Sequence, residues 1–262
     1  MPGPRFTDIR RFESIDSTNR YLLDEARAGA PEGVVAVASH QTAGRGRLGR
    51  SWEAPAGSNL LASVLLRPEL PPDRRHLACA VVALAAADAA RPIGVEAVVK
   101  WPNDLLAADG RKLAGVLAEA DLARPAGAAP PPVVVGIGIN ANWPATDADL
   151  PPELVGSATS LRQQSGRPVD VEELLGGLLE ALEPRAADLS SPDGQARQSA
   201  DLRARCITIG TLVSVELADG RLEGTAVDVT VEGHLIVECA GQNRTVVAGD
   251  VVHVRPGHDP RS

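Results

Sequence analysis

The segment from Gln41 to Trp52 restricts the possible folds of this chain more than any other, because its composition disfavours both a helix and a regular strand. It reads QTAGRGRLGRSW, so three glycines alternate with three arginines. Ordering these glycines costs much conformational entropy, yet the segment concentrates backbone donors and positive charge. The apolar runs on either side, residues 33–39 and 59–68, are typical of strands. We therefore expect a sheet that carries a long cationic loop, which is either a solvated surface loop or a lid that closes over an anion.

Two common nucleotide-binding motifs do not explain this loop. Gly44, Gly46 and Gly49 match the G-x-G-x-x-G dinucleotide fingerprint, but that fingerprint must begin a helix, which Pro55 and Gly57 prevent here. The chain contains no G-x-x-x-x-G-K-[ST] sequence either. No serine nucleophile elbow and no catalytic arrangement of histidines is visible. Any chemistry at this loop must therefore proceed without a histidine base.

The composition is that of a globular, acidic protein. Of its 262 residues 44% are hydrophobic but only 2% are aromatic, so alanine, valine and leucine must fill the core. Core helices without evident chemistry are expected at 75–91 and 171–189. The length accommodates one large domain, or a large and a small one. The formal net charge of −8 argues against a general nucleic-acid surface, so the positive charge of the loop is a local feature.

Nothing in the sequence points to secretion, a membrane or a structural metal. Cys79, Cys206 and Cys239 are far apart and odd in number, which fits neither a disulfide framework nor a zinc site. The N-terminus does not resemble a signal peptide, and no apolar run reaches about 18 residues. We expect a cytoplasmic protein with no membrane partner.

Short polar side chains are expected at the start of an early helix. Residues 5–15 are typical of a short strand, and the segment after them predicts a helix that Asp16 or Ser17 caps. Ser17, Thr18 and Asn19 then lie at the helix N-terminus. Free N–H groups there bind a polar ligand, or the three side chains only cap the helix.

The stretch 95–120 predicts two strands joined by a polar turn, with Asp109 and Gly110 at the tip of the hairpin. The charged and polar residues around this turn are Lys100, Asn103, Asp104, Arg111 and Lys112. A charged hairpin tip is ordinarily solvated, but Lys112 precedes an apolar strand that would hold its backbone rigid. A rigidly held lysine is what a phosphate clamp requires.

A further strand is expected at residues 133–142, which read VVVGIGINAN. Gly136 and Gly138 weaken this strand, and such glycines usually mark the close approach of a ligand or of another backbone. Asn140 and Asn142 end it with amide groups able to read a base or a ureido group.

After residue 205 the pattern changes to short alternating strands separated by glycine-containing turns. Four or five such strands fit a small SH3-like barrel. We expect a catalytic domain over residues 1–205 and a C-terminal domain over residues 206–262, the latter serving for packing or partner docking.

One class of reaction proceeds without a base at such a site. A carboxylate substrate with a pKa of about 4–5 is already ionised at neutral pH and attacks phosphorus directly. Its repulsion by a triphosphate must be removed by arginines, a lysine and Mg²⁺. Arg45, Arg47, Lys112 and the Asn103–Asp104 pair suit attack on the α-phosphate of ATP, which gives an acyl-adenylate. Because water hydrolyses such an adenylate, a glycine-rich lid is useful. The residues alone thus indicate a nucleotide-using ligase.

Five ordered motifs resemble those of biotin protein ligases. They are S-T-N (17–19), Q-x-x-G-R-G-R-x-G-R-x-W (41–52), K-W-P-N-D (100–104), K-L-A-G-V-L-x-E (112–119) and G-I-G-I-N (136–140). The resemblance implies an α+β fold in which helices flank a mixed β-sheet, akin to class II aminoacyl-tRNA synthetases, with a small C-terminal SH3-like β-barrel. It also implies two steps. Biotin and MgATP give biotinyl-5′-AMP and pyrophosphate, and the biotinyl group then passes to a lysine of a biotin carboxyl carrier domain of an acyl-CoA carboxylase.

The same resemblance assigns roles to individual residues. Biotin would contact Ser17, Thr18, Asn19, Gln41, Gly44, Arg45, Lys112, Gly115, Gly136 and Gly138, with the last three glycines lining its apolar slot. ATP would contact Arg47, Arg50, Trp52, Asn103, Lys112 and Asn140, with Trp52 stacked on adenine and Asn140 at the edge of the base. Lys112, Arg47 and Asp104 would be catalytic, and Mg²⁺ would bind near Asn103 and Asp104. Beyond the resemblance, the acceptor lysine must either lose its proton or be desolvated, and we assign Asp104 to this role as our own hypothesis.

The sequence departs from one branch of the family and leaves alternatives open. Bifunctional members carry an N-terminal DNA-binding domain, whereas only sixteen residues precede Ser17 here. We expect a monofunctional ligase without specific DNA binding, either a monomer or a homodimer. A lipoate or octanoate ligase shares the scaffold, but the motifs at 41–52 and 100–104 favour biotin. A non-enzymatic RNA-contacting protein is disfavoured by the charge of −8 and the scarce aromatics.

Overall fold

The computed structural model describes residues 3–71, 74–120, 131–217, 220–247 and 250–253. The two ends of the chain, which belong to the expected ranges 1–205 and 206–262, lie outside the described residues.

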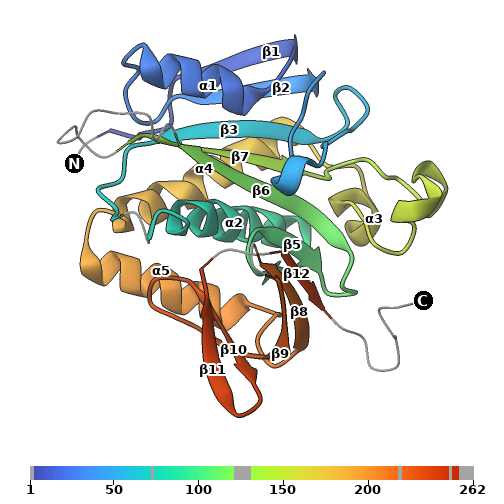
Figure 1. Cartoon of the computed structure of the whole chain (residues 1–262). Coiled ribbons are helices and arrows are strands. Elements are labelled where there is room, and N and C mark those ends of the chain that lie inside the picture. The colour runs from blue at the N-terminus through green and yellow to red at the C-terminus, as the bar shows by residue number, and fades with distance from the viewer. Residues whose placement is uncertain (1–2, 72–73, 121–130, 218–219, 248–249, 254–262) are drawn as a thin grey trace.

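Seven strands form the larger sheet, in the order β1-β2-β3-β7-β6-β5-β4 (Figure 1). Their bounds are β1 (Ile9–Ile15), β2 (Val35–Gln41), β3 (Leu60–Leu66), β4 (Ala97–Lys100), β5 (Asp104–Ala107), β6 (Lys112–Ala120) and β7 (Val133–Ile139). β1 and β2 are parallel, because helix α1 (Thr18–Arg27) crosses between them, and every other neighbouring pair is antiparallel. The sheet is therefore mixed, which confirms the expectation.

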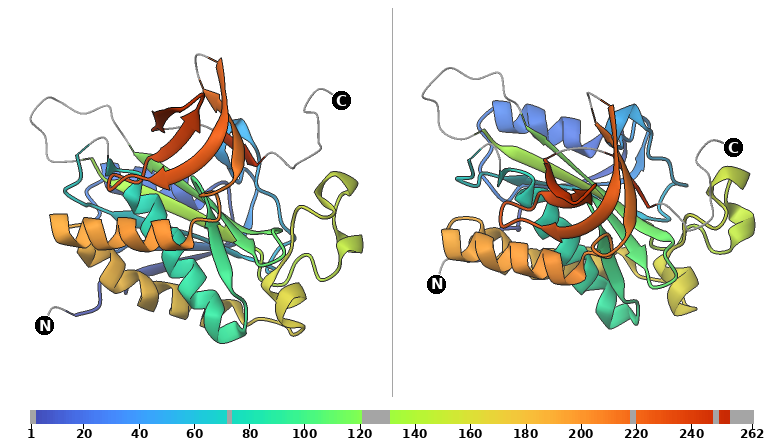
Figure 2. Two further views of the ribbon diagram at one scale, coloured as in Figure 1. Left: turned by 90° about the horizontal axis from the view of Figure 1, so that it is seen from below. Right: turned by 60° about the horizontal axis from the view of Figure 1, so that its bottom comes forward.

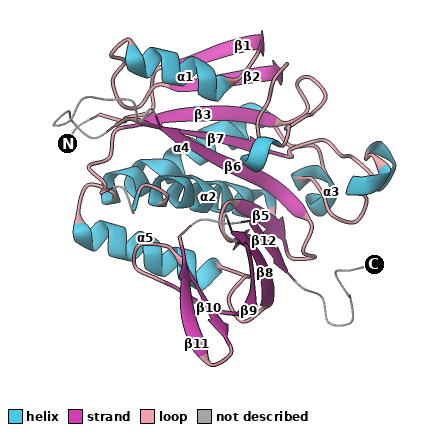
Figure 3. Ribbon diagram, viewed as in Figure 1, coloured by secondary structure: helices cyan, strands magenta, loops and turns pink. Residues whose placement is uncertain are grey.

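Helices cover both faces of this sheet (Figure 3). α1 lies on one face, against β2, β3 and β7, while α2 (Leu77–Ala90) lies on the other face against β4, β6 and β7. Helices α4 (Val171–Asp188) and α5 (Pro192–Arg205) pack against α2. Only Asp88 of α2 is not buried, and the many alanines of this helix let its neighbours approach closely. The core is thus built almost without aromatic residues.

Shorter helical segments lie in the connections. They are α3 (Leu161–Ser165) and the 3₁₀ turns η1 (Arg47–Gly49), η3 (Arg91–Ile93), η4 (Asp147–Asp149) and η5 (Pro152–Leu154).

The alternation of side chains along the central strands decides where a ligand has room. Val135 and Ile137 of β7 belong to the core on the α2 side, so Gly136 and Gly138 between them face the α1 side. Gly115 of β6 pairs directly with Gly138. Beyond the N-terminus of α1, this face of the sheet is therefore floored by glycines instead of large side chains.

Five strands form the second sheet, which begins shortly after α5 (Figure 2). They are β8 (Leu212–Leu217), β9 (Gly220–Val229), β10 (Leu235–Cys239), β11 (Gln242–Val246) and β12 (Asp250–His253), all antiparallel in the order β11-β10-β9-β8-β12. This agrees with the expected small C-terminal β unit. The division at residues 205 and 206 stays a prediction, because one cluster of buried side chains runs through both parts.

The stretch 95–120 differs from expectation, since it forms three strands instead of two. β4 ends at Lys100, a short turn through Trp101 and Pro102 follows, and β5 begins at Asp104. The predicted hairpin with Asp109 and Gly110 at its tip joins β5 to β6.

Trp101 in that turn faces the second sheet. Its indole Nε1 donates to the carbonyl of Gly233 at 3.0 Å, and its backbone N–H donates to Thr208 Oγ1 at 3.0 Å. This tryptophan therefore joins the two sheets.

A network of four charged side chains ties α2, α4 and α5 together. Arg185 NH2 lies 2.6 Å from Asp88 Oδ2 and 2.7 Å from Asp201 Oδ2, and Arg205 contacts the same two carboxylates at 2.6 and 2.8 Å. Burial by itself raises the pKa of Asp88, but the hydrogen bonds from Arg205 and Arg185 outweigh it and lower this pKa below its ordinary value. The network thus joins the three helices on the α2 side of the sheet by ion pairs.

Removing Arg185 tests this network. We expect Arg185→Ala to lower the free energy of unfolding in urea by about 3 kcal/mol, because Asp88 and Asp201 lose a shared, largely buried partner. Because the folded pKa of Asp88 is lowered, its contribution is present above the unfolded pKa and is lost as the pH falls through the folded value. The difference from wild type should therefore shrink in acid.

The matched control is Arg11→Ala, which breaks an exposed pair with Glu172 and should cost at most about 1 kcal/mol. Equal losses in the two variants would contradict a structural role of the network.

Candidate active site

A cavity of about 130 Å³ lies where the 41–52 loop, the N-terminus of α1 and the glycines of β6 and β7 meet. It contains almost all of the residues singled out from the sequence. Those that line it are Ser17, Thr18, Asn19, Gln41, Arg45, Arg47, Arg50, Trp52, Asn103, Asp104, Lys112, Gly115, Gly136 and Gly138. Five separate motifs, up to 121 positions apart in the chain, therefore converge on one pocket.

Gly44 and Asn140, to which the resemblance assigns ligand contacts, do not line this cavity. Lys100, Arg111 and Asn142 do not line it either, and the Asn142 amide is hydrogen-bonded to the backbone of Val169. Gly44 lines a second cavity, together with Asp16, Arg20 and Ala43. Asn140 is buried, and its amide donates to the carbonyls of Thr159 and Lys112 at 2.9 and 3.4 Å and accepts from Asn59 at 3.2 Å. These contacts make Asn140 a link between β7 and the segment around Thr159, so its contact with adenine stays a prediction.

The 41–52 loop, which we call the lid, is a closed, hairpin-like structure. Trp52 N–H donates to the Gly44 carbonyl at 3.0 Å, and Gly46 N–H donates to the Arg50 carbonyl at 2.7 Å. A Cβ on Gly44 would lie 2.3 Å from the Trp52 carbonyl oxygen, so only glycine allows this narrow neck. At the tip, Leu48 is exposed and has a φ of +55°, a conformation that is costly for leucine.

Polar side chains at the start of α1 form one hydrogen-bonded set. Both Thr18 N–H and Thr18 Oγ1 donate to Gln41 Oε1, at 2.8 and 3.0 Å. The buried hydroxyl of Ser63 on β3 lies 2.7 Å from Thr18 Oγ1 and 2.6 Å from Asn19 Oδ1. Ser17 caps the helix by accepting from Arg20 N–H. The set presents donors and acceptors at fixed positions, as recognition of a small polar group requires.

The opposite end of the cavity is charged. Lys112 Nζ lies 2.7 Å from Asp104 Oδ1 and 5.7 Å from the centroid of the Trp52 ring. Arg47 of the lid donates to Asn103 Oδ1 at 3.2 Å, and Asn103 in turn donates to the Val116 carbonyl at 2.8 Å. Asn103 therefore orients Arg47 toward this end of the pocket.

The backbone of Lys112 is held from outside the sheet as well. Its N–H donates to the Ser157 carbonyl at 2.8 Å, and its carbonyl accepts from Thr159 N–H at 2.9 Å. The sequence predicted a rigid lysine from the strand that follows it. The second support, from a segment more than 40 residues away, has no local sequence signal.

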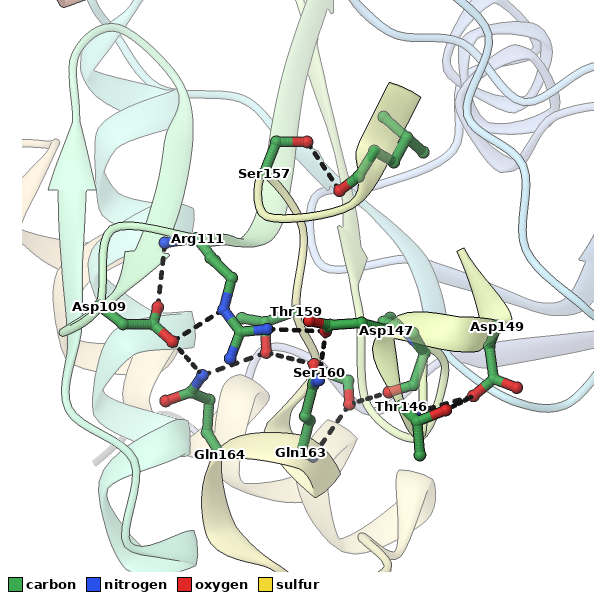
Figure 4. A network of polar contacts seen from close by, with 12 residues as sticks. Asp109, Arg111, Thr146, Asp147, Asp149, Ser157, Thr159, Ser160, Gln163 and Gln164 are labelled. Carbon is green, nitrogen blue, oxygen red and sulfur yellow. Dashed lines mark hydrogen bonds and ion pairs between the residues drawn. The ribbon is translucent and has the colours of Figure 1, made fainter. Parts of the chain in front are cut away.

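A polar network fastens that supporting segment to the β5–β6 hairpin (Figure 4). Arg111 contacts Asp109 at 2.8 Å and Asp147 at 2.9 Å, while Gln163 and Gln164 donate to the same two carboxylates. Burial by itself raises the pKa of Asp109, but the hydrogen bonds that its carboxylate accepts from Arg111 and Gln164 outweigh this effect. The pKa of Asp109 is therefore below its ordinary value, and the side chain remains charged. The network fixes the chain on both sides of Lys112.

The indole of Trp52 lies on the glycine floor of the cavity. A Cβ on Gly138 would lie 2.4 Å from Trp52 Cε2, and one on Gly115 would lie 3.1 Å from Trp52 Cζ3. Trp52 Nε1 is buried and has no hydrogen-bond acceptor among the described residues. Leaving such a donor unpaired costs about 1–3 kcal/mol, which weakens the binding of the indole to this floor. Its position also explains why the cavity is smaller than the roughly 300–1,000 Å³ of ordinary ligand pockets.

The metal-binding capacity of the pocket is limited. Among the described residues, no group of three or more histidine, cysteine, aspartate and glutamate side chains is placed to hold a metal ion. Asp104 is the one carboxylate that lines the cavity, and the Asn103 oxygen already accepts from Arg47. This fits Mg²⁺ only in its usual role with nucleotides, where phosphate oxygens and water supply most ligands.

Two residues of the site, Ser63 and Glu119, received no role from the sequence. Ser63 is the only polar residue in the strand Leu60–Leu66, and its isolation there was a usable signal. Glu119 lies at the end of β6, where its carboxylate contacts Asn19 and Arg45. It closes the 112–119 motif and shares a face with Gly115, but only the fold brings it to the helix and the lid.

Together, the mixed sheet, the glycine floor and the cationic lid define the class: an α+β domain with a small pocket lined by polar and cationic groups. Residues 11–140 match the Biotin/lipoate A/B protein ligase family, and residues 208–254 match the Biotin protein ligase C terminal domain.

Relatives agree with these matches over most of the chain. The chain is 39% identical to the biotin–[acetyl-CoA-carboxylase] ligase of Mycobacterium tuberculosis, over 91% of this chain and 86% of that protein. It is 32% identical to the bifunctional ligase/repressor BirA of Bacillus subtilis, over 90% of this chain and 71% of that protein. Its fold is similar to a biotin protein ligase from Aquifex aeolicus in complex with biotin and ATP, with a TM-score of 0.79 and 25% identity over 95% of this chain and all of that one. The chain therefore belongs to the biotin protein ligase family and is an enzyme, a ligase.

The position of Trp52 generates a direct prediction. In Gly138→Ala, the new methyl group overlaps the indole, so we expect Trp52 to leave the glycine floor and become more exposed. Tryptophan emission should shift to the red, and acrylamide should quench it more strongly. Gly176→Ala is the control, because a Cβ there meets nothing within 4 Å. Identical spectra for Gly138→Ala and wild type, at equal thermal stability, would place Trp52 elsewhere in solution.

Proposed function

We propose that this ligase activates biotin with ATP as biotinyl-5′-AMP and then transfers the biotinyl group to a lysine of a biotin carboxyl carrier domain. One observation carries this proposal. A polar helix terminus, a glycine-floored slot and a lysine–arginine end follow one another in a single pocket beneath the lid. That order matches the ureido ring, the apolar body and the carboxylate of biotin, and relatives named as biotin ligases support it.

The polar end of the pocket would hold the ureido ring. A ureido group presents one acceptor and two donors, so its site must offer both kinds of partner. Ser17, Thr18, Asn19 and Gln41, with backbone groups of Gly44 and Arg45, supply them in this proposal. The slot over the glycines would take the thiophane ring and the valeryl chain, after the Trp52 indole has moved aside. The freed indole, with Arg50, would then bind the nucleotide.

The charged end of the pocket would carry out the first step. A carboxylate oxygen of biotin forms a bond to the α-phosphorus of ATP, and the bond from that phosphorus to the bridging oxygen breaks to release pyrophosphate. Lys112, Arg45 and Arg47 offset the repulsion between carboxylate and triphosphate, which is the main obstacle to this attack. Mg²⁺, when bound, supplies further positive charge to the phosphates, and Asp104 with Asn103 would lie beside it.

The second step requires a neutral acceptor amine. A lysine with a pKa of about 10.4 is neutral in roughly one molecule in 10³ at pH 7. Its nitrogen attacks the carbonyl carbon of the adenylate, AMP leaves, and the amine proton passes to an acceptor, for which we propose Asp104. Lys112 already shares a contact with this carboxylate at 2.7 Å.

Other expectations stay predictions. They are the cytoplasmic location, the absence of specific DNA binding, and a monomeric or homodimeric state. As for membranes, the structure has, within its described part, no helix with the length and apolarity needed to span one.

Mass spectrometry of a carrier domain tests the proposed reaction. After incubation with the enzyme, MgATP and biotin, one lysine of the carrier should gain the mass of a biotinyl group. Lipoate in place of biotin serves as the comparison. Modification by lipoate alone, or pyrophosphate release that does not depend on biotin, would overturn the proposal.

We expect Lys112→Ala to abolish adenylate formation while leaving biotin affinity close to that of the wild type. The lysine charge acts mainly on the transition state, so its loss should lower kcat by roughly 10²–10³-fold. Pyrophosphate release and calorimetric titration with biotin measure the two effects separately. Near-normal turnover of the variant would remove Lys112 from the mechanism.

A further inference from the structure

Glu119 is the one acidic residue of the 112–119 motif, and the reaction proposed above gives it no role. It lies on β6, on the same face of the sheet as Gly115 and Leu117, because the three positions alternate with core residues. Its side chain is 24% exposed, at the rim where the lid meets the sheet. Its two carboxylate oxygens serve two different parts of the site.

One oxygen of Glu119 orients Asn19. Asn19 Nδ2 donates to Glu119 Oε2 at 2.7 Å and to the Leu117 carbonyl at 3.2 Å, so both of its N–H groups are engaged. Its Oδ1 accepts from Ser63 at 2.6 Å. A Cβ on Gly136 would lie 2.3 Å from that Oδ1, so the amide rests directly on the sheet. Asn19 is held at three points, and Glu119 is the only charged one.

The other oxygen of Glu119 holds the lid. Glu119 Oε1 lies 3.3 Å from Arg45 NH1, and the Arg45 side chain is about half exposed. Pairs of this kind contribute only about 0–1 kcal/mol. An anion inside the pocket can therefore take Arg45 away from Glu119 at little cost. Asp104 contacts Lys112 in the same manner, at 2.7 Å. Each of the two cations is therefore paired with a carboxylate that a bound anion can replace.

We propose that Glu119 is a positioning residue with two tasks: it orients Asn19 at the biotin end of the pocket, and it holds Arg45 of the lid until the negative charge of the substrate draws that arginine inward. The inference rests on the proposed function for the identity of the substrate. The part of the inference that concerns the contact between Glu119 and the lid does not depend on the proposed function.

Two substitutions separate the two tasks. Glu119→Gln keeps an oxygen that accepts from Asn19 but removes the charge that holds Arg45. Glu119→Ala removes both contacts. Glu172→Gln is the matched control, because it removes the charge of an exposed glutamate that pairs with Arg11 at 2.7 Å, away from the pocket.

Limited trypsin digestion measures how firmly Glu119 holds the lid, because trypsin cleaves the chain after Arg45, Arg47 and Arg50, which all lie in the lid. Without ligands, Glu119→Gln and Glu119→Ala should be cut in the lid roughly two- to fivefold faster than wild type, as loss of a pair worth up to about 1 kcal/mol allows. With saturating biotin and ATP, the difference between Glu119→Gln and wild type should disappear, because Arg45 has then left Glu119. The Glu172→Gln control should match wild type in both conditions.

Steady-state kinetics test the other task, the orientation of Asn19. Glu119→Ala should raise the KM for biotin by roughly tenfold, the effect expected for one lost hydrogen bond to a charged group. Its kcat should change much less, because Lys112 and Arg47 are untouched. Glu119→Gln should keep a KM within about threefold of the wild-type value. If the role of Glu119 were merely structural, the variants would have a lower thermal midpoint and a lower kcat, and the KM for biotin would not differ between Glu119→Ala and Glu119→Gln in this way.

The outcomes are distinct. Unchanged lid cleavage in both Glu119 variants would overturn the hold on Arg45, and an unchanged KM in Glu119→Ala would overturn the orientation of Asn19. Failure of the wild-type enzyme to biotinylate any carrier would refute the proposed function instead, and the ligand-free digestion would still test the contact with the lid.

Discussion

In our proposal, the pocket depends on an exchange of negative charge between its own carboxylates and the substrates. Lys112 and Arg45 each face a carboxylate of the large sheet, Asp104 at 2.7 Å and Glu119 at 3.3 Å. Without these partners, positive groups on a strand and on a glycine-rich lid would repel one another, and the lid would lose one of its contacts with the sheet. Because such pairs are individually weak, the carboxylate and phosphates of a substrate can replace them at small cost. In the proposed mechanism, the same residues stabilise the pocket before binding and neutralise the substrates after it.

The fold provides for this exchange in a simple way. Alternation along β7 and β6 directs aliphatic side chains to the α2 face and leaves glycines on the α1 face, so a slot forms without weakening the core. The Trp52 indole covers that slot in the described structure. With its unpaired Nε1 it is a poor substitute for a ligand that satisfies its own polar groups. In the proposed mechanism, binding replaces both the indole on the glycine floor and the carboxylates beside the cations.

Much of this arrangement follows from the sequence, and the reasons are local. The lid, the capped start of α1 and the central helices each have a composition or a periodicity that decides their structure without distant partners. The third strand in 95–120 was missed because β5 is only four residues long, Asp104–Ala107, and lies between two short turns, so that it was read as part of one polar turn. Membership in the family, which five spaced motifs indicated, is confirmed by the relatives.

What the sequence did not provide are the partners that only the fold brings together. The amide of Asn140 is engaged by Asn59 and Thr159, which are 81 and 19 positions away, so its type alone could not decide between reading a base and joining two segments. Ser63 and Glu119 acquire roles only because β3 and β6 carry them to the start of α1. The contacts that a polar side chain makes thus depend on the fold more strongly than does the extent to which that side chain is buried.

The most direct test of the exchange of negative charge is a crystal structure of this enzyme with biotin and ATP. The account predicts that the carboxylate of biotin lies beside Lys112, that the Trp52 indole has left Gly138, and that Arg45 has turned from Glu119 toward the ligands. Ligands bound away from residues 41–52 and Lys112, or an indole still seated on Gly138 with biotin present, would contradict it.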